Sequence, residues 1–322
     1  MGYTGSTEII FLLLCLLTFS AEPTTEDIDN YSTIKTVQPT LKHLLLRNIS
    51  SQLLMQPGFS AHRTEGHKGS KYYISSADMS KIGCPYGTVP ILTSYNSSMR
   101  ATHFNKKIAH KDNGNNGGYG HSSISVWEPD LGTGRPPRYT GAVVEVQNEG
   151  IRIGTGWYVD PDMYGDNHAH FEIGWTDNDK SCTNLRCEGF VQLSTRIVPG
   201  AVLKPVSKIT GKQYLMMVSI FKLFTNMSGS ANMIGWMGVS NAASGEPYPP
   251  MGSGQPAAEG EGRAVFFTDV KVIDASMEYV SPYLTEIFTS MISPDCYRVG
   301  TPSTDDMGLH FYFGGAGCSP SH

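Results

Sequence analysis

The chain has 322 residues, a formal net charge of −5 and only 16% charged residues. Its 35 glycines and 19 prolines imply many turns and few long helices, so the composition favours short strands over a helical bundle. Because no basic patch is present to neutralise phosphates, we do not expect nucleic acid as a partner.

Residues 1–20 have the pattern of a secretory signal peptide. The apolar run 9–17 is long enough for a signal core but too short to span a bilayer; the alternative is a short buried helix. Thr18 and Ser20 supply the small residues expected before a cleavage site near Ser20. No later stretch is apolar enough to cross a membrane. We therefore expect a secreted protein that has no membrane attachment after signal removal.

The cysteines agree with an oxidising compartment. Cys182 and Cys187 lie in one short polar stretch, and Cys296 and Cys318 bracket the last segment, so each pair is predicted to form a disulfide. The first pair could instead bind a metal, but no second C-x-x-C or H-x3-H follows it. We predict no metal site and no cofactor. Cys84 is left without an assigned partner.

Four Asn-x-Ser sequons are consistent with a glycosylated, secreted surface. They begin at Asn30, Asn48, Asn96 and Asn226.

The chain divides at about residue 115. Residues 21–115 are predicted to be a mixed pro-segment, with a short amphipathic helix at 41–46 and a flexible, protease-accessible linker from Lys106 to Gly118. Residues 116–322 contain strand-like stretches separated by Gly/Pro turns, which predicts an all-β, antiparallel β-sandwich of two packed sheets. The strand-like stretches are 121–127, 141–146, 213–220 and 264–267, and residues 283–291 are weakly helical.

Two short motifs follow the strand-like residues 151–159. Asp160-x-Asp162-x-x-Gly165 is similar to the start of a calcium loop, but Phe171 stands where a bidentate Glu is required, so we interpret it as a turn capped by side chains. His168 and His170 would point the same way on a strand, as zinc ligands do, and Glu172 continues that face. We interpret this face as exposed and hydrophilic. No Ser-His-Asp order, nucleophile elbow or phosphate-binding loop is readable.

Five stretches of the chain resemble the neprosin family of plant secreted glutamic peptidases. They are CPYGTVPI (84–91), YGHSSISVWEPDLG (119–132), GWYVDPDMYGDNHAHFEIGWTDNDKSCTNLRCEGFVQ (156–192), PMGSG (250–254) and CYRVGTPSTDDMGLHFYFGGAGC (296–318). The first resembles the end of the family's activation peptide. The resemblance implies a β-sandwich, a removable N-terminal activation peptide, and cleavage at proline in an acidic extracellular setting such as the apoplast or cell wall.

The family's chemistry uses two glutamates, one protonated and one ionised. The resemblance places the first three residues before Trp157, at Gly154. The best match for the second, three residues after the Trp of a W-G-G-E-V motif, is Val239. Neither residue can exchange a proton. Glu246 is the first substitute that we consider, and Glu145, Glu149 and Glu172 are the other nearby acids.

Three functions are therefore compatible with the sequence. The first is an impaired or non-catalytic protein, a pseudoenzyme, that binds a proline-containing peptide or protein in an aromatic groove. The second is an active acidic glutamic endopeptidase with relocated carboxylates, and the third is a β-sandwich that binds cell-wall glycans. Whether the chain is an enzyme stays open. The residues predicted to line the groove are Trp157, Tyr158, Tyr164, Trp175 and Trp236.

Overall fold

The computed structural model describes most of the chain after residue 118 and four short strands before it. The described residues are 34–37, 72–75, 89–92, 108–111, 119–132, 138–148, 150–177, 180–186, 190, 192, 194, 197–220, 231, 233–273, 278–291 and 293–319. The predicted signal peptide, the helix at 41–46, the four sequons, Cys84 and Cys187 lie outside these residues.

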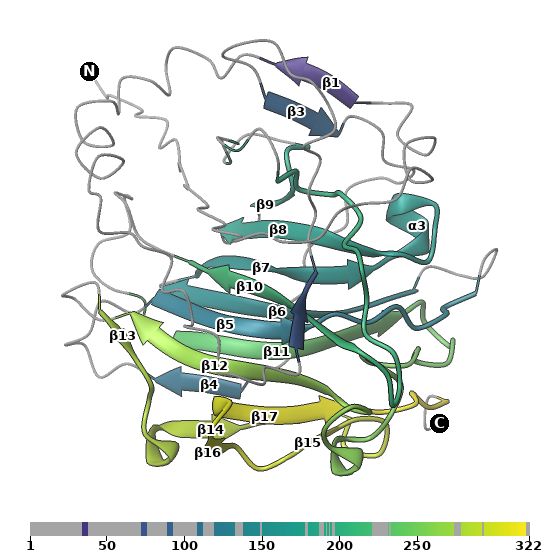
Figure 1. Cartoon of the computed structure of the whole chain (residues 1–322). Coiled ribbons are helices and arrows are strands. Elements are labelled where there is room, and N and C mark those ends of the chain that lie inside the picture. The colour runs from purple at the N-terminus through teal and green to yellow at the C-terminus, as the bar shows by residue number, and fades with distance from the viewer. Residues whose placement is uncertain are drawn as a thin grey trace.

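Two β-sheets make up the fold and confirm the predicted β-sandwich (Figure 1). The eight-stranded sheet has the order β15-β17-β12-β5-β10-β2, with β13 on β12 and β16 on β17. Its strands are β2 (Tyr72–Ile74), β5 (Tyr119–Ser125), β10 (Gln213–Ser219), β12 (Val265–Ile273), β13 (Tyr279–Val280), β15 (Arg298–Val299), β16 (Ser303–Asp305) and β17 (Gly308–Gly314).

The seven-stranded sheet has the order β14-β4-β11-β6-β7-β8-β9 and is antiparallel throughout. In Figure 1 it runs from β9 and β8 near the top of the view down to β4 and β14. Its strands are β4 (Ile108–Lys111), β6 (Arg138–Asn148), β7 (Ile151–Val159), β8 (Ala169–Asp177), β9 (Lys180–Thr183), β11 (Met233–Ala242) and β14 (Ile287–Thr289).

The core lies between the two sheets and is filled by alternate residues of each strand, as the period of two requires. Val144, Trp157 and Trp236 from the seven-stranded sheet meet Ile124 and Phe267 from the eight-stranded sheet, and all five are fully buried. Both indoles also donate a hydrogen bond across the core to backbone oxygens of β5: Trp157 Nε1 to Ser125 O at 3.0 Å, and Trp236 Nε1 to His121 O at 3.3 Å. The two sheets are therefore joined by polar as well as apolar contacts.

Strands from the region predicted to be the pro-segment are part of both sheets. Ile108–Lys111, inside the predicted linker, form β4, which pairs with β11 on one side and β14 on the other. Tyr72–Ile74 form β2, which runs parallel to β10, the one departure from antiparallel pairing among the described strands of the sandwich. Of the strands that the structure describes, β1 (Ile34–Val37) and β3 (Val89–Leu92) form a separate two-stranded sheet. A flexible linker was therefore the wrong prediction for residues 108–111, because free edges of the sheets recruit these short segments.

The helix predicted at 283–291 is also wrong. One 3-10 turn, η3 (Leu284–Glu286), is followed directly by β14, whose Ile287 pairs with His110 of β4. Available strand partners override the weak helical pattern here. The other helical elements in the described part of the chain are α3 (Pro161–Tyr164) and η2 (Ala257–Glu259). No helix among the described residues is long and apolar enough to cross a membrane.

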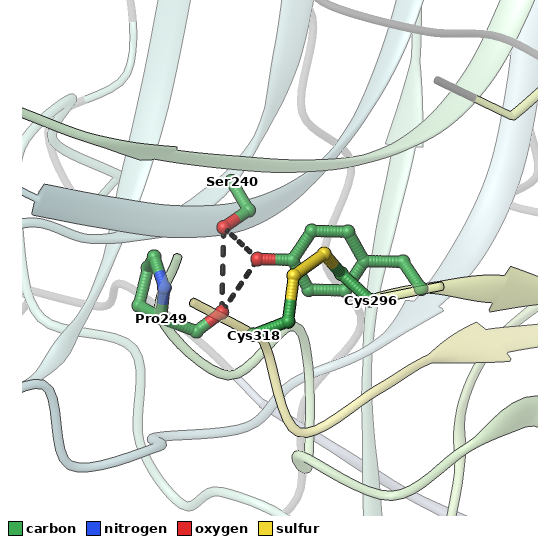
Figure 2. The surroundings of a disulfide bond; sticks show 5 residues. Ser240, Pro249, Cys296 and Cys318 are labelled. Carbon is green, nitrogen blue, oxygen red and sulfur yellow. Dashed lines mark hydrogen bonds between the residues drawn. A yellow bond between two sulfur atoms is a disulfide. The ribbon is translucent and has the colours of Figure 1, made fainter. Parts of the chain in front are cut away.

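A disulfide joins Cys296 and Cys318, as predicted, and closes the C-terminal segment (Figure 2). Beside it, the Tyr297 hydroxyl donates to Pro249 O at 2.7 Å and lies 2.7 Å from Ser240 Oγ on β11. Burial raises the pKa of Tyr297 to about 12, against a smaller lowering by Ser240. Cys182 is disulfide-bonded too, while its predicted partner Cys187 lies outside the described residues. The disulfide and the tyrosine together hold the tail against β11.

We expect a native chain nicked within residues 112–118 to stay in one piece. Because β4 is paired on both sides and β2 pairs with β10, the N-terminal fragment should co-elute with the C-terminal fragment on size-exclusion chromatography and separate only in denaturant. Separation of the two fragments in native buffer would contradict this structural role of β2 and β4.

Candidate functional site

The candidate site is the outer face of the seven-stranded sheet, which is the face turned away from the core. Successive residues of a strand point to opposite faces of the sheet. The residues of β6, β7 and β11 that do not point into the core therefore lie on this face. Five of these form a second apolar cluster, each at most 7% exposed, which we call the outer-face cluster: Tyr139, Val143, Tyr158, Met237 and Val239.

Both positions that the sequence assigns to the family glutamates lie on this face. Gly154 alternates with the core residues Ile153 and Trp157, and Val239 belongs to the outer-face cluster. The register puts Gly154 opposite Glu145 of β6, and Glu145 opposite Gly235 of β11. Val239 is therefore two strands away from Gly154 across the sheet, at about 4.8 Å per strand. Along the strand direction it is four residues away, at about 3.4 Å per residue. The two positions share a face but are not immediate neighbours.

Three of the predicted groove residues do not lie on this face. Trp157 and Trp236 are fully buried in the core, and Trp175 packs against the core from β8. They alternate with the outer-face residues along their strands, so their side chains point to the opposite face of the sheet. Tyr158, in the outer-face cluster, and Tyr164, at the adjoining corner, are the predicted aromatic residues left for the site. The prediction used only the aromatic character of these residues, which does not say to which face of the sheet each side chain points.

Two buried glutamates flank Gly154 on the outer face. Glu145 lies directly across from it on β6, and Glu172 of β8 lies opposite Gly156, two residues further along β7. They are 1% and 2% exposed. Between them β7 offers only glycines, and no side chain fits at Gly156, because its Cβ would come within 2.0 Å of Ala142 O. Glu145 and Glu172 are two strand spacings but only two residues apart, so their backbone positions are closer together than those of Gly154 and Val239.

The corner between β7 and β8 is built as the sequence predicted, with acids that cap a turn. Asp160 is the N-cap of α3 and accepts a hydrogen bond from Met163 N at 3.1 Å, with Pro161 in the first turn. Gly165 ends the helix in the left-handed conformation at φ 84°, and its N–H donates to Pro161 O. Asp160 is therefore an architectural acid.

A buried polar network connects this corner to Glu172. The Tyr164 hydroxyl donates to Glu172 Oε2 at 2.9 Å and accepts from Asn184 Nδ2 at 3.0 Å. The Tyr164 ring stacks on His170, with centroids 3.8 Å apart and planes 4° from parallel. Because Tyr164 contacts both residues, the corner holds the Glu172 side chain in position.

His170 binds two acceptors at once. Its Nδ1 lies 2.6 Å from Gly200 O and its Nε2 lies 2.9 Å from Asp166 Oδ1. Both contacts are satisfied together when both ring nitrogens carry protons. The exposed hydrophilic face predicted for this strand is thus wrong for His170 and Glu172, which are buried and bonded.

His168 does not share this environment. Its side chain is 41% exposed and its Nδ1 lies 3.3 Å from Glu128 Oε1. Among the described residues no group of three His, Cys, Asp or Glu side chains is arranged to hold a metal ion.

Glu246, the first substitute considered from sequence, is in the turn after β11. Its backbone N–H donates to Ala243 O at 3.0 Å, and it is off the strands that form the outer face. Strand register therefore favours Glu145 and Glu172, which were considered from sequence only as further nearby acids, over Glu246, and the pairing of β6, β7 and β8 is what brings these two together.

Substitution of Tyr164 by Phe tests the polar network. The change removes one hydroxyl and leaves Asn184 and Glu172 each short of one hydrogen bond in a buried site, so we expect a loss of about 2 kcal/mol in the free energy of unfolding. Chemical denaturation measures it. Tyr283→Phe is the matched control, because Tyr283 is 75% exposed, and should change stability by less than about 0.5 kcal/mol. Equal effects of the two variants would contradict the network.

Asp166 should contribute stability that depends on pH. Burial alone would raise its pKa, but the hydrogen bond and charge of His170 and the N–H of His168 hold the pKa below the ordinary value. A depressed pKa stabilises the fold above the unfolded-state value of about 3.9, and that stability is lost as the pH falls through the lower folded value. Because Asp166 is 39% exposed, the contribution should be only about 1 kcal/mol. We expect Asp166→Asn to lower the Tm at neutral pH and the difference to shrink only below about pH 4; a constant difference down to pH 2 would refute this linkage.

The family model described as Neprosin matches residues 136–223 and 221–316, which together include β6 to β12 and the C-terminal strands up to the last residues of β17. The matched region is more than half of the 322 residues and contains Gly154, the corner at α3 and the glutamates that flank β7. The chain belongs to the neprosin family.

Proposed function

We propose that this chain is a secreted neprosin-family protein that has lost the family's catalytic pair and binds proline-containing peptides on the outer face of the seven-stranded sheet. One observation carries the proposal: Gly154 and Val239, the positions predicted from sequence for the two family glutamates, both lie on this face and neither has a carboxyl group. A water molecule there cannot be activated by one member of the pair while the other donates a proton. General acid–base catalysis is worth about 10²–10⁴ in rate, so its loss leaves binding without efficient cleavage.

The surface that remains suits an apolar, extended peptide. Tyr139 and Tyr158 lie 5.9 Å apart between ring centroids, beside Val143 and Met237. Proline-rich segments are preformed extended ligands that dock on such aromatic surfaces. The cluster is buried in the full chain, so binding requires displacement of what covers it, which fits the removable activation peptide implied by the family.

An active endopeptidase with relocated carboxylates is the second candidate. It is favoured by Glu145 and Glu172, which lie on the same face on either side of the empty Gly154 position. Two carboxylates that share one proton at acidic pH provide the acid and the base that the family mechanism needs.

The experiment is an assay of the secreted, acid-processed protein with proline-containing quenched peptides, alongside fluorescence anisotropy for binding. We expect peptide binding with cleavage at most about 1% of that of Gly154→Glu/Val239→Glu, which restores both carboxyl groups. Gly154 does not have a positive φ, so its backbone conformation is one that a residue with a side chain can adopt.

Three outcomes would change the assignment. Strong wild-type cleavage that is abolished by Glu145→Gln or Glu172→Gln, but not by the control Glu246→Gln, would establish the second candidate. Failure of the double variant to gain cleavage would contradict the assignment of the two positions. Retention on cell-wall glycans without peptide binding would replace both proposals with the carbohydrate-binding alternative.

A further inference from the structure

A separate cluster of a nucleophile, a base and an acid lies on the other sheet. It comprises Ser219 at the end of β10, His121 on β5 and Asp269 on β12. His121 Nδ1 lies 2.6 Å from Ser219 Oγ, and His121 Nε2 lies 3.4 Å from Asp269 Oδ2. The three residues are 98 and 148 positions apart in the chain, which is why no sequence pattern revealed them.

Strand register explains how the three side chains meet. Ser219 and His121 are direct partners in the β10–β5 pair. The β12–β5 pair has an irregularity between Thr268 and Lys271, and Asp269 within it has a φ of 51°. A bulge of this kind re-aims a side chain, here toward His121. The alternate residues Val218 and Val270 lie in the core, so the cluster is on the outer side of the eight-stranded sheet.

The charges of the cluster set the direction of its hydrogen bonds. Burial would raise the pKa of Asp269, but hydrogen bonds from His121 and Lys271 lower it to about 2, and Lys271 Nζ lies 2.7 Å from Asp269 Oδ1. An ionised carboxylate only accepts, so the tautomer that fits this contact has its proton on His121 Nε2. Nδ1 is then left with its lone pair directed at the Ser219 hydroxyl. This is the arrangement in which a histidine acts as a base toward serine.

Tyr279 completes the cluster from β13. Its ring meets the edge of His121, with centroids 5.1 Å apart, and its hydroxyl is hydrogen-bonded to Ser219. Burial, and then the charge of Asp269, raise the pKa of Tyr279, against a lowering by Ser219. A phenol that stays protonated can donate to an oxyanion formed at Ser219. The side chains of His121 and Asp269 are 14% and 32% exposed, so a small molecule can reach the cluster.

We propose that Ser219, His121 and Asp269 form a second site, one that accepts acyl groups from small esters. His121 Nδ1 takes the Ser219 proton as Oγ bonds to the ester carbonyl carbon. The carbonyl oxygen then reforms its double bond as the bond to the alkoxy oxygen breaks, and the alcohol leaves with the proton from His121. A water molecule repeats the sequence, giving up its proton to His121 and releasing the carboxylic acid and free Ser219. Asp269 is a positioning residue that keeps the proton on Nε2.

The test treats the full chain with a fluorophosphonate probe and, separately, with p-nitrophenyl acetate. We expect one equivalent of covalent label, located by peptide mapping on Ser219 in the unmutated protein. Ser219→Ala should remove the label. His121→Gln should slow labelling about 100-fold or more, and Asp269→Asn should slow it at least tenfold without changing the stoichiometry.

Ser240→Ala is the matched control. Ser240 Oγ also has a close hydrogen bond, but its partners are the Tyr297 hydroxyl at 2.7 Å and Pro249 O at 3.4 Å rather than a histidine (Figure 2). Absence of label on the unmutated protein, label on another residue, or an unchanged rate in a folded His121→Gln variant would overturn the proposal. Peptide mapping of the unmutated protein decides the result even if a variant fails to fold. Because the cluster is on the opposite sheet, the outcome is independent of the peptide-binding proposal.

Discussion

The structure depends on the contact between the inner faces of the two sheets, above all on Trp157 and Trp236. Both indoles are fully buried, and each reaches across the core to hydrogen-bond a backbone oxygen of β5. Truncation of a buried tryptophan of this kind typically costs about 3–5 kcal/mol. Because strands alternate with a period of two, placing these indoles inside also places Gly154, Tyr158 and Val239 outside. The packing of the core thus decides which residues are available for function.

The outer face of the seven-stranded sheet is bordered by a well-ordered polar corner. The corner at α3 is fully formed, with the Asp160 cap, the left-handed Gly165 and the hydrogen bond from Tyr164 to Glu172. The two positions predicted from sequence for the family glutamates hold no acid, yet two other glutamates are buried beside β7. Burial of carboxylates is costly unless they are hydrogen-bonded, so the network through Tyr164 and Asn184 helps to maintain Glu172 there.

The region before residue 116, predicted to be a pro-segment, contributes strands to the sandwich itself. β2 and β4 belong to it by sequence and to the two sheets by pairing. Removal of β4 from between β11 and β14 would expose an edge of β11, and unpaired edges promote association with other strands. A cut between β4 and β5 alone therefore does not release β2 and β4, because backbone hydrogen bonds hold them in the sheets.

The sequence by itself determined the fold class, the capped turn at Asp160–Gly165, the disulfide between Cys296 and Cys318, and the family. These follow from local patterns: period-two alternation, Gly and Pro turns, and a long contiguous motif. Tertiary structure decided the rest. Three of the aromatic residues predicted for a groove, Trp157, Trp175 and Trp236, instead belong to the core or pack against it. Residues 108–111 and 287–289 became strands because free edges of the sheet were available to them. Glu145 with Glu172, and Ser219 with His121 and Asp269, are brought together only by strand register, a long-range property that no local pattern in one sequence encodes.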